Sequence, residues 1–565
     1  MTSKIAGTPT SHGASALATS NLRCVAGCIA LHYHDWPARG ELASVARVRR
    51  VTTAATLMVQ GTASSVGKSL VVTALCRYFQ RYGVRVAPFK AQNMSLNAAV
   101  TPDGFEIGRA QAVQAEAARI AARVEMNPIL LKPESELGAQ LVLMGKPAGR
   151  VQARDFGRDQ GEQRRAVERA LATLRADFEL VLIEGAGSPV ELNLKDRDLV
   201  NMHVAKLADA PVILVGDIDR GGVFASLYGT LALLPDDERA RVAALLVNKF
   251  RGERALFEPG IAQLRALCDK PVLGVLPHLS ALRIADEDSV SLAPRLRAAR
   301  ALEPLPESAG VIDLAVIALP HLANYDDLLA LEHEPDVRVR FVREPAQLQG
   351  ADLVIVPGTK STLVDLDWLR ASGFAEALQA RARAGGLLLG ICGGCQMLGE
   401  RIEDPDGVES SAPSRVEGLG LLPLHTRFES GKRTAQALAR THAASFLADA
   451  GEALPARGYE LHMGRVVALQ PTAAAFEISE RNGKHEQALD GAVHPRGHVL
   501  GTMLHGLFDD AALRTRLLTR LRARRGLGPH TPRETLDEYD RLADAVEQHL
   551  DTALLWRLIG RAQRA

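Results

Sequence analysis

The sequence predicts an α/β fold built from two parallel-sheet domains, and three observations support this. After about residue 52, apolar runs of strand length alternate with amphipathic segments of helix length, which is typical of parallel sheets covered on both faces. Two glycine-rich turns each follow an apolar strand and precede a helix. A stretch rich in Pro, Ala and charge near residue 300 separates two such series. We therefore expect a leader (1–52) that is either disordered or upstream of the true start, a first domain (53–295), a linker (296–310), a second domain (311–510) and a helical tail (511–565).

The composition argues against nucleic-acid binding, a membrane span and a disulfide framework. The net charge is +1 and aromatic residues make up 4%, so neither charge nor base stacking favours nucleic acid as a partner. The sequence contains no apolar run of about 18 residues, so we expect no membrane span. Six scattered cysteines fit a reducing cytoplasm rather than a disulfide framework. In the leader, the spacing of Cys24, Cys28, His32 and His34 matches no standard zinc pattern.

The first domain begins with a strand followed by a helix over Lys68–Tyr82, which Gly83 is placed to end. Continuous apolar runs predict its buried strands, at Thr56–Gln60, Val84–Phe89, Leu180–Ile183, Val212–Val215, Ala243–Val247 and Val272–Leu276.

The second domain begins a new alternating series, with strands expected at Ile312–Leu319, Val337–Val342, Leu353–Val356 and Leu387–Gly390. Beyond Gly399 the pattern predicts irregular structure, interrupted by strands near Gly464–Leu469 and His498–Thr502. From about Ala511 it predicts amphipathic helix.

A P-loop lies between the first strand and helix, in the segment Gly61-Thr-Ala-Ser-Ser-Val-Gly67-Lys68-Ser69. Its backbone N–H groups would bind phosphate, Lys68 would reach the terminal phosphates of ATP and Ser69 would ligate Mg²⁺. Five residues separate the two glycines where the common pattern has four, and this form resembles the dethiobiotin synthetase branch of P-loop proteins. A glycine turn without a ligand is the alternative.

Other polar residues follow the predicted strands of the first domain. Glu184 ends one strand and is the expected second metal ligand; a solvent-facing glutamate is the alternative. Asp217 and Asp219 would either contact metal or substrate or cap the next turn. Asn248 is placed to read adenine, with a structural turn as the other interpretation.

The second glycine-rich turn, Gly390-Ile391-Cys392-Gly393-Gly394, predicts a nucleophile elbow. A helix N-terminus favours the thiolate form of a cysteine. The N–H groups of Gly393 and of Gly358, in the loop Pro357–Lys360, could form an oxyanion hole. Cys392 and Cys395 also form a C-x-x-C pattern, so a redox or zinc site is the rival interpretation; otherwise Cys395 is a buried helix residue.

A thiol nucleophile needs a base. His505, in Gly-Thr-Met-Leu-His-Gly-Leu-Phe just after an apolar strand, is the leading candidate. A lone histidine in such a place is more often structural, but the elbow cysteine favours the catalytic interpretation.

Taken together, these motifs resemble the cobyric acid synthase family. The resemblance covers almost the whole chain after the leader and rests on long segments in the same order: GTASSVGKS, FKAQNMSLNA, EIGRAQAVQA, EGAGSPVELNL, DIDRGGVFAS, NKFRG, GICGGCQMLG, GYELHMGR and GTMLHGLF. It implies a dethiobiotin synthetase-like first half, a class I glutamine amidotransferase second half, and Cys392 and His505 as catalytic residues. The implied reaction is the ATP- and glutamine-dependent amidation of the b, d, e and g carboxylates of adenosylcobyrinic acid a,c-diamide, a corrinoid.

One departure from the broader glutaminase pattern concerns the group that orients His505. Many class I domains carry a glutamate two residues after the histidine, where this chain has Leu507. Glu460 or His462 could supply the orienting group, or a Cys–His dyad could suffice. The rival functions are the sibling synthase that amidates the a and c carboxylates, and a partitioning-type P-loop ATPase.

Overall fold

The computed structural model describes residues 53–135, 138–152, 160–279, 282, 284–285, 310–410, 412–470, 473–531 and 537–562. The expected leader, with its cysteines and histidines, lies outside these residues, as does the expected linker except for Gly310. Among the described residues, no helix is both long and apolar enough to cross a membrane.

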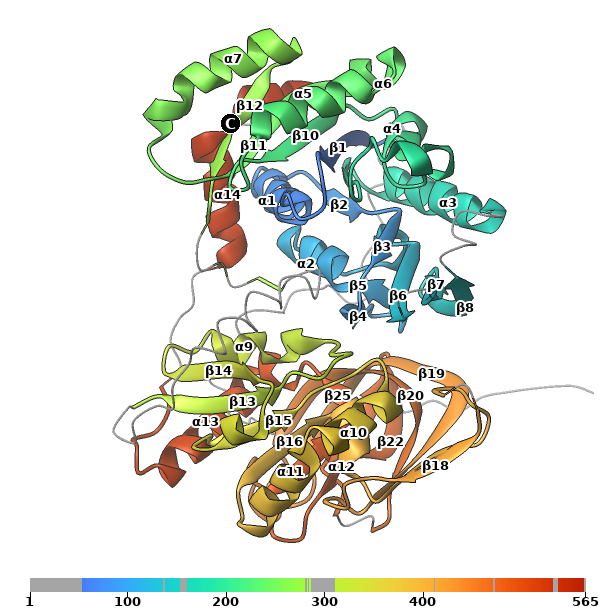
Figure 1. Ribbon diagram of the computed structural model, residues 1–565, viewed down its shortest axis with the longest axis vertical. Coiled ribbons are helices and arrows are strands. Elements are labelled where there is room, and N and C mark those ends of the chain that lie inside the picture. Colours follow the sequence, from blue (N-terminus) through green and yellow to red (C-terminus); the bar gives the residue numbers. More distant parts are fainter. Residues whose placement is uncertain are drawn as a thin grey trace, which may run out of the picture. The chain divides into compact units, whose positions relative to one another are not determined.

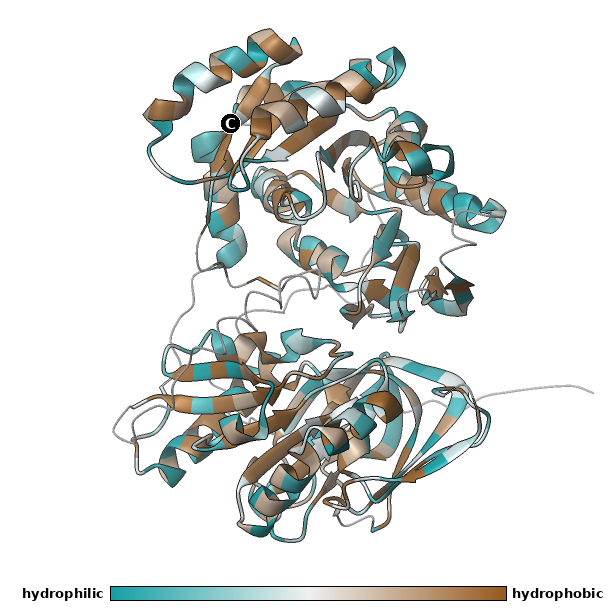
Figure 2. Ribbon diagram, in the orientation of Figure 1, coloured by the Kyte–Doolittle hydropathy of each residue, from teal (hydrophilic) through white to brown (hydrophobic). Residues whose placement is uncertain are grey.

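Parallel strands form the central sheet of the first half, in the order β12-β11-β10-β1-β9-β2. Their bounds are β1 Ala55–Gly61, β2 Val86–Phe89, β9 Leu180–Glu184, β10 Val212–Asp217, β11 Val242–Phe250 and β12 Val272–Pro277. All six strands expected from the sequence are present, and the parallel sheet is confirmed. Figure 2 shows strands such as β10 as largely hydrophobic, because both faces of the sheet are covered.

Helices cover both faces of this sheet (Figure 1). Leu57 and Val59 of β1 pack with α1, whereas Met58 between them packs on the opposite face with α3, α4, α5 and α7, as the alternation of side chains along a strand requires. The helices are α1 Lys68–Arg81, α3 Gly161–Asp177, α4 Met202–Ala208, α5 Val223–Leu233, α6 Asp236–Arg241 and α7 Glu258–Cys268.

The C-terminal segment contributes to the core of the first half. It is helical: α13 Ala511–Arg524 packs in the core of the second half, whereas α14 Glu538–His549 and α15 Thr552–Leu558 pack in that of the first. Trp556 of α15 is buried beside α1, where its indole N–H donates to the Tyr78 hydroxyl at 2.9 Å and its ring meets Phe79 edge-on. The chain therefore returns to its first domain after completing the second.

A layer that the sequence did not reveal follows β2. It contains a four-stranded sheet, a two-stranded ribbon and helix α2. The sheet consists of β3 Gln92–Met94, β6 Ile129–Ser135, β7 Gly138–Leu143 and β8 Lys146–Gln152. The ribbon consists of β4 Ala98–Val100 and β5 Glu106–Gly108, and α2 spans Arg109–Ala117. The described residues of the first half also form the 3₁₀ helices η1 Val124–Met126, η3 Leu192–Arg197 and η4 Arg254–Phe257.

The second half has its own central sheet, ordered β14-β13-β15-β16-β24-β23, parallel except for β23. Its strands are β13 Ile312–Ile317, β14 Val337–Val342, β15 Leu353–Val356, β16 Leu387–Ile391, β23 Ala492–Val493 and β24 Val499–Thr502. The α-helices of this half are α9 Leu329–Glu332, α10 Thr362–Ala371, α11 Phe374–Arg383 and α12 Gly393–Leu398. Short 3₁₀ helices are η6 Tyr325–Leu328, η7 Pro345–Leu348 and η9 Leu507–Asp509. The four strands expected from the sequence before Gly399 are confirmed.

The expectation of irregular structure after Gly399 is wrong, although the strands expected near Gly464–Leu469 and His498–Thr502 are present, as the end of β20 and as β24. This region forms a seven-stranded mixed sheet dominated by the long antiparallel pair β19 and β20. Its strands are β17 Arg401–Asp404, β18 Ser414–Glu417, β19 Leu424–Thr441, β20 Pro455–Ala468, β21 Phe476–Arg481, β22 Lys484–Asp490 and β25 Leu504–His505. Buried and exposed positions alternate along β19, and its inward residues include small or polar ones, which hides the strand pattern in the sequence.

The two halves share buried contacts within the unit Thr53–Ala565. An apolar cluster joins Ala98 and Val100 of β4 to Tyr459 and Leu461 of β20. Beside it, the buried carboxylate of Glu106 lies between Lys132 of its own half and Lys432 of β19. Further ion pairs join the halves, including Lys360 Nζ to Glu134 at 3.0 Å.

Candidate active site

The P-loop has the backbone that its glycines require. Gly67 has φ 98° immediately before α1, in the left-handed region that glycine adopts without strain. A Cβ on Gly61 would lie 2.5 Å from a methyl group of Val66, and one on Gly67 would lie 2.3 Å from the Asn248 amide nitrogen. Neither position has room for a side chain.

Lys68, Ser69 and Glu184, the residues expected to bind phosphate and metal, lie next to this loop. The hydroxyl of Ser69 donates to Glu184 Oε1 at 2.8 Å, and Lys68 Nζ donates to the carbonyls of Ala63 at 2.9 Å and Gly187 at 3.1 Å. Glu184 is fully buried. A hydroxyl and a carboxylate are hard oxygen donors of the kind that Mg²⁺ prefers, so this pair fits the expected metal.

Glu184 has further buried partners from outside the P-loop. Lys90 Nζ lies 2.9 Å from Oε1, and Gln114 Nε2 of α2 donates to Oε2 at 2.5 Å. The sequence predicted neither partner, although both lie in segments that carry the family resemblance.

Asn248, the expected adenine-reading residue, ends up beneath the P-loop. It is buried in β11, and its Nδ2 donates to the Val66 carbonyl at 2.8 Å. The side chain therefore supports the shape of the loop. Asp217 accepts from the N–H of Asp219 at 2.9 Å and pairs with Lys249 at 2.9 Å, contacts that match the turn-capping interpretation.

Cys392 lies at the sharp turn between β16 and α12, with φ 51° and ψ −111°. Such an angle strains a residue other than glycine, and strain of this kind is typical of a nucleophile elbow. A Cβ on Gly394 would lie 1.9 Å from the carbonyl oxygen of Val356, so the turn requires glycine there. Cys395 is fully buried in α12, as expected, and burial raises the pKa of its thiol well above the usual value.

His505 is held by an aspartate, Asp327, that the sequence did not predict. Its Nδ1 lies 2.7 Å from Asp327 Oδ2, while Asp327 Oδ1 accepts from the N–H of Gly506 at 2.8 Å. The ring of Tyr459 stacks on the imidazole at 5.2 Å. Burial lowers the pKa of His505, but the negative charges of Asp327 and of a Cys392 thiolate outweigh it and raise the pKa well above its usual value.

The suggestions that Glu460 or His462 orients His505 are wrong. The carboxylate of Glu460 pairs with Arg481, and Nδ1 of His462 lies 3.1 Å from the carbonyl of Gly464. The signal for Asp327 was two adjacent acidic residues soon after an apolar strand, in Asn-Tyr-Asp-Asp-Leu. Nothing local distinguishes them from an ordinary acidic turn.

The predicted oxyanion glycines border the thiol. A methyl group on Gly358 would lie 3.2 Å from His505 Cε1 and 3.8 Å from the Cβ of Cys392, and one on Gly393 would lie 2.6 Å from a methyl of Thr359. Gly358 therefore lies directly against the Cys392–His505 pair, and Gly393 lies against the loop that carries Gly358 and Thr359.

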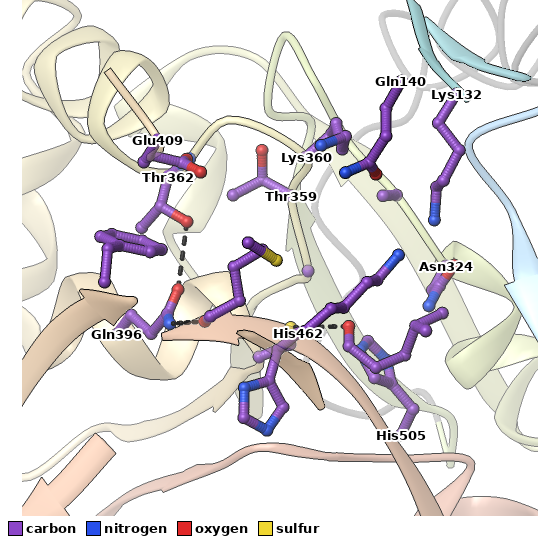
Figure 3. Close-up of a pocket in the computed structure, with 17 residues that line it drawn as sticks. Lys132, Gln140, Asn324, Thr359, Lys360, Thr362, Gln396, Glu409, His462 and His505 are labelled. Carbon is purple, nitrogen blue, oxygen red and sulfur yellow. Dashed lines mark hydrogen bonds between the residues drawn. The ribbon is translucent and has the colours of Figure 1, made fainter. Parts of the chain in front are cut away.

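A cavity of about 60 Å³ opens beside Cys392 and His505. Figure 3 shows Thr362, Gln396 and Glu409 on one side of this pocket and Lys132, Gln140 and Asn324 on the other. Lys132 and Gln140 belong to β6 and β7 of the first half, so both halves of the chain line the pocket.

Comparisons with known proteins agree with this division. Residues 57–292 match the CobQ/CobB/MinD/ParA nucleotide binding domain, and residues 313–513 match the CobB/CobQ-like glutamine amidotransferase domain. The chain is 58% identical to the cobyric acid synthase of Sorangium cellulosum (strain So ce56), over 91% of this chain and all of that one. It is 47% identical to the cobyric acid synthase of Photorhabdus laumondii, over 89% of this chain and 97% of the other.

Proposed function

This chain belongs to the cobyric acid synthase family and is a glutamine-dependent amidoligase, and from that premise we propose its reaction. It transfers ammonia from glutamine to the b, d, e and g carboxylates of adenosylcobyrinic acid a,c-diamide, at the expense of ATP. The observation that carries the proposal is the buried Asp327–His505 pair beside the Cys392 elbow. This arrangement suits a thiol nucleophile with an oriented base.

In the second half, the Cys392 thiolate attacks the side-chain amide of glutamine. The N–H groups of Gly358 and Gly393 stabilise the oxyanion, and His505 gives a proton to the departing ammonia. Asp327 keeps the proton of the neutral ring on Nδ1, so that Nε2 serves the thiol. Water then hydrolyses the glutamyl thioester, with His505 accepting the proton of that water.

The rest of the pocket suits the two charged ends of glutamine. Glu409 and Gln396 line one wall and would bind the α-amino group, while Lys360 lines the pocket and would attract the α-carboxylate. Burial raises the pKa of Glu409, and a bound ammonium group would favour its charged form.

In the first half, Ser69 and Glu184 would hold Mg²⁺, and Lys68 would move from its present carbonyl partners to the phosphates. When bound, ATP supplies the phosphoryl group that turns a substrate carboxylate into an acyl phosphate with a good leaving group, and Mg²⁺ neutralises charge on the phosphates. The P-loop backbone, whose shape Asn248 supports, binds and orients the phosphates. Ammonia then displaces phosphate and leaves an amide.

Ammonia has to cross between the halves without picking up a proton from water. Residues of both halves line the Cys392 pocket, which supports a protected route across this boundary. The reaction belongs in the cytoplasm, where ATP and glutamine are available.

Mass spectrometry of the product tests the proposal. Incubation of the a,c-diamide with ATP and glutamine should add four amides, whereas amidation of cobyrinic acid at positions a and c would identify the sibling synthase. Cys392→Ser should abolish glutamine-dependent amidation and retain activity with ammonium salts, while Lys68→Ala should lose both. Survival of glutamine-dependent activity in Cys392→Ser would overturn the nucleophile assignment.

A further inference from the structure

The loop that carries Gly358, one of the two expected oxyanion donors, is tied to a neighbouring segment of the chain. It connects β15 to α10 and runs antiparallel to a segment that follows β13. The carbonyl of Gly358 accepts from the N–H of Ala323 at 3.0 Å, and the N–H of Lys360 donates to the carbonyl of His321 at 3.0 Å. The backbone is therefore held on both sides of Thr359.

Thr359 lies against both expected donors. It directly follows Gly358, and a Cβ on Gly393 would lie 2.6 Å from the Thr359 methyl and 3.2 Å from its backbone nitrogen. Thr359 also lines the Cys392 pocket beside Lys360 and Thr362 (Figure 3). A shift of this one residue therefore changes the spacing of the two N–H groups that would stabilise the oxyanion.

A buried carboxylate on α10 fixes the side chain of Thr359. The Thr359 hydroxyl donates to Asp365 Oδ2 at 2.5 Å, and its oxygen accepts from the N–H of Ser361 at 3.0 Å. The hydroxyl also lies 3.2 Å from the carbonyl of His321, but a hydrogen bond to a carboxylate is stronger than one to a neutral carbonyl. Asp365 is fully buried in the first turn of its helix, where the helix dipole favours negative charge.

His321 occupies the other oxygen of this carboxylate. Its Nδ1 lies 2.8 Å from Asp365 Oδ1, and its backbone N–H donates to Oδ2 at 3.3 Å. Because a carboxylate only accepts, Nδ1 carries the proton of this bond. The imidazole lies outside the described lining of the Cys392 pocket, so it acts on the loop rather than on glutamine.

The donors that meet at Asp365 come from both of the segments that have to stay together. Burial of a carboxylate is costly unless hydrogen bonds compensate for it, so the separation of either segment from Asp365 is unfavourable. An oxyanion donor is effective only within about 2.7–3.1 Å of the oxygen that becomes charged. A network that prevents small movements of this loop therefore acts on the transition state.

We propose that Asp365 and His321 are positioning residues for glutamine cleavage, which act by holding Thr359 in place. Thr359 in turn keeps the two oxyanion N–H groups at the spacing that the tetrahedral intermediate needs. The inference rests on the proposed function, since it takes Cys392 as the nucleophile and the two glycine N–H groups as donors. Its consequence is that loss of the network slows the attack on the amide but leaves glutamine binding and the thiol unchanged.

Thr359→Val, made in the full chain, removes the hydroxyl and keeps the size of the side chain. Glutamate release during amidation gives kcat and KM for glutamine, and alkylation by iodoacetamide, followed on the Cys392 peptide by mass spectrometry, reports the reactivity of the thiol. We expect kcat to fall by about 10- to 100-fold, less than the 10²–10³-fold that loss of a whole oxyanion donor costs. KM should stay within about twofold, because an interaction made only in the transition state changes kcat and kcat/KM equally. The alkylation rate should not change.

Further variants assign the effect to the network. Thr359→Ser keeps the hydroxyl and should recover most of the activity. Asp365→Ala removes the carboxylate and should show the same loss of kcat as Thr359→Val, whereas His321→Ala removes one of its donors and should lose less. Thr173→Val makes the same substitution on α3, where the hydroxyl bonds only to the backbone of its own helix; it is the matched control and should keep full activity.

The outcomes separate this proposal from the proposed function. A kcat of Thr359→Val equal to that of the unaltered protein overturns the positioning role, and so does a Thr359→Ser variant as slow as Thr359→Val. A fall of the same size in ammonium-dependent amidation or in the alkylation rate also overturns it, because the change would then lie in the fold or in the thiol. Glutamine-dependent activity that survives complete alkylation of Cys392 would instead overturn the nucleophile assignment.

Discussion

Replacing Asp327 with asparagine changes the proton on His505 without changing the shape of the site. At present one carboxylate oxygen accepts from His505 Nδ1 and the other from the N–H of Gly506. An amide offers one accepting oxygen and one NH₂ group. Because the N–H of Gly506 can only donate, the amide oxygen has to stay there and the NH₂ faces Nδ1. The neutral imidazole must then carry its proton on Nε2, the nitrogen that should receive the thiol proton.

The size of the effect follows from these contacts. A hydrogen bond to a charged group contributes about 1.5–3 kcal/mol, and about 1.36 kcal/mol corresponds to a factor of ten in rate. Loss of the bond alone thus predicts a decrease of about 10- to 160-fold. The wrong tautomer adds to this, and the equivalent change in the Ser-His-Asp triad of serine proteases costs about 10⁴. We expect kcat/KM for glutamine to fall by about 10²- to 10⁴-fold.

The assay compares glutamine-dependent with ammonium-dependent amidation in Asp327→Asn. Only the first should fall, since ammonium bypasses the thiol. Asp367→Asn, an exposed aspartate on α10, is the control and should change neither. Glutamine-dependent kcat/KM equal to that of the unaltered protein would refute the orienting role of Asp327.

The pH profile supplies a second readout. The charge of Asp327 helps to raise the pKa of His505, so the imidazolium needed to protonate ammonia persists to high pH. Without that charge the pKa falls, and the alkaline limb of the glutaminase rate should move to lower pH. An alkaline limb that stays in place would show that another charge controls His505.

Three further predictions concern stability. Burial raises the pKa of Glu106, but its buried lysine partners outweigh burial and lower the pKa from 4.5 to about 2. Its contribution of about 3 kcal/mol is therefore present above pH 4.5 and is lost as the pH falls towards 2. Glu106→Gln should remove this pH dependence from urea denaturation curves and destabilise the protein at pH 7. Trp556→Ala should lower the free energy of unfolding by about 3–5 kcal/mol, the usual cost of emptying a buried aromatic site, and a change below 1 kcal/mol, typical of surface positions, would contradict the packing of α15 on α1. Gly394→Ala should abolish the folded elbow, because the new Cβ would lie 1.9 Å from the carbonyl oxygen of Val356. Gly431→Ala is the control and should be tolerated, because a Cβ there would meet open space. Equal melting temperatures for the two variants would contradict the close packing of Gly394.

Features that depend only on neighbouring residues could be predicted from the sequence. Apolar runs located both parallel sheets, and the glycines around Lys68 and Cys392 located the two strand-to-helix turns, since each turn requires a backbone that only glycine adopts or tolerates. Ser69 and Glu184 could be paired from sequence because both follow buried strands of one parallel sheet, whose carboxyl ends meet at one edge.

Partners that come from distant segments of the chain became apparent only in the folded protein. Asp327 lies 178 residues before His505, and an acidic pair in a turn carries no local sign of such a partner. The same holds for the packing of Trp556 on α1 and for the ion pair of Arg109 with Asp326. In the sequence, Trp556 and Arg109 look like ordinary helix residues. The long strand β19 and the first part of β20 were hidden because strand preference depends on what a pleated surface packs against. The folded chain, rather than any motif, brings Asp327 to His505.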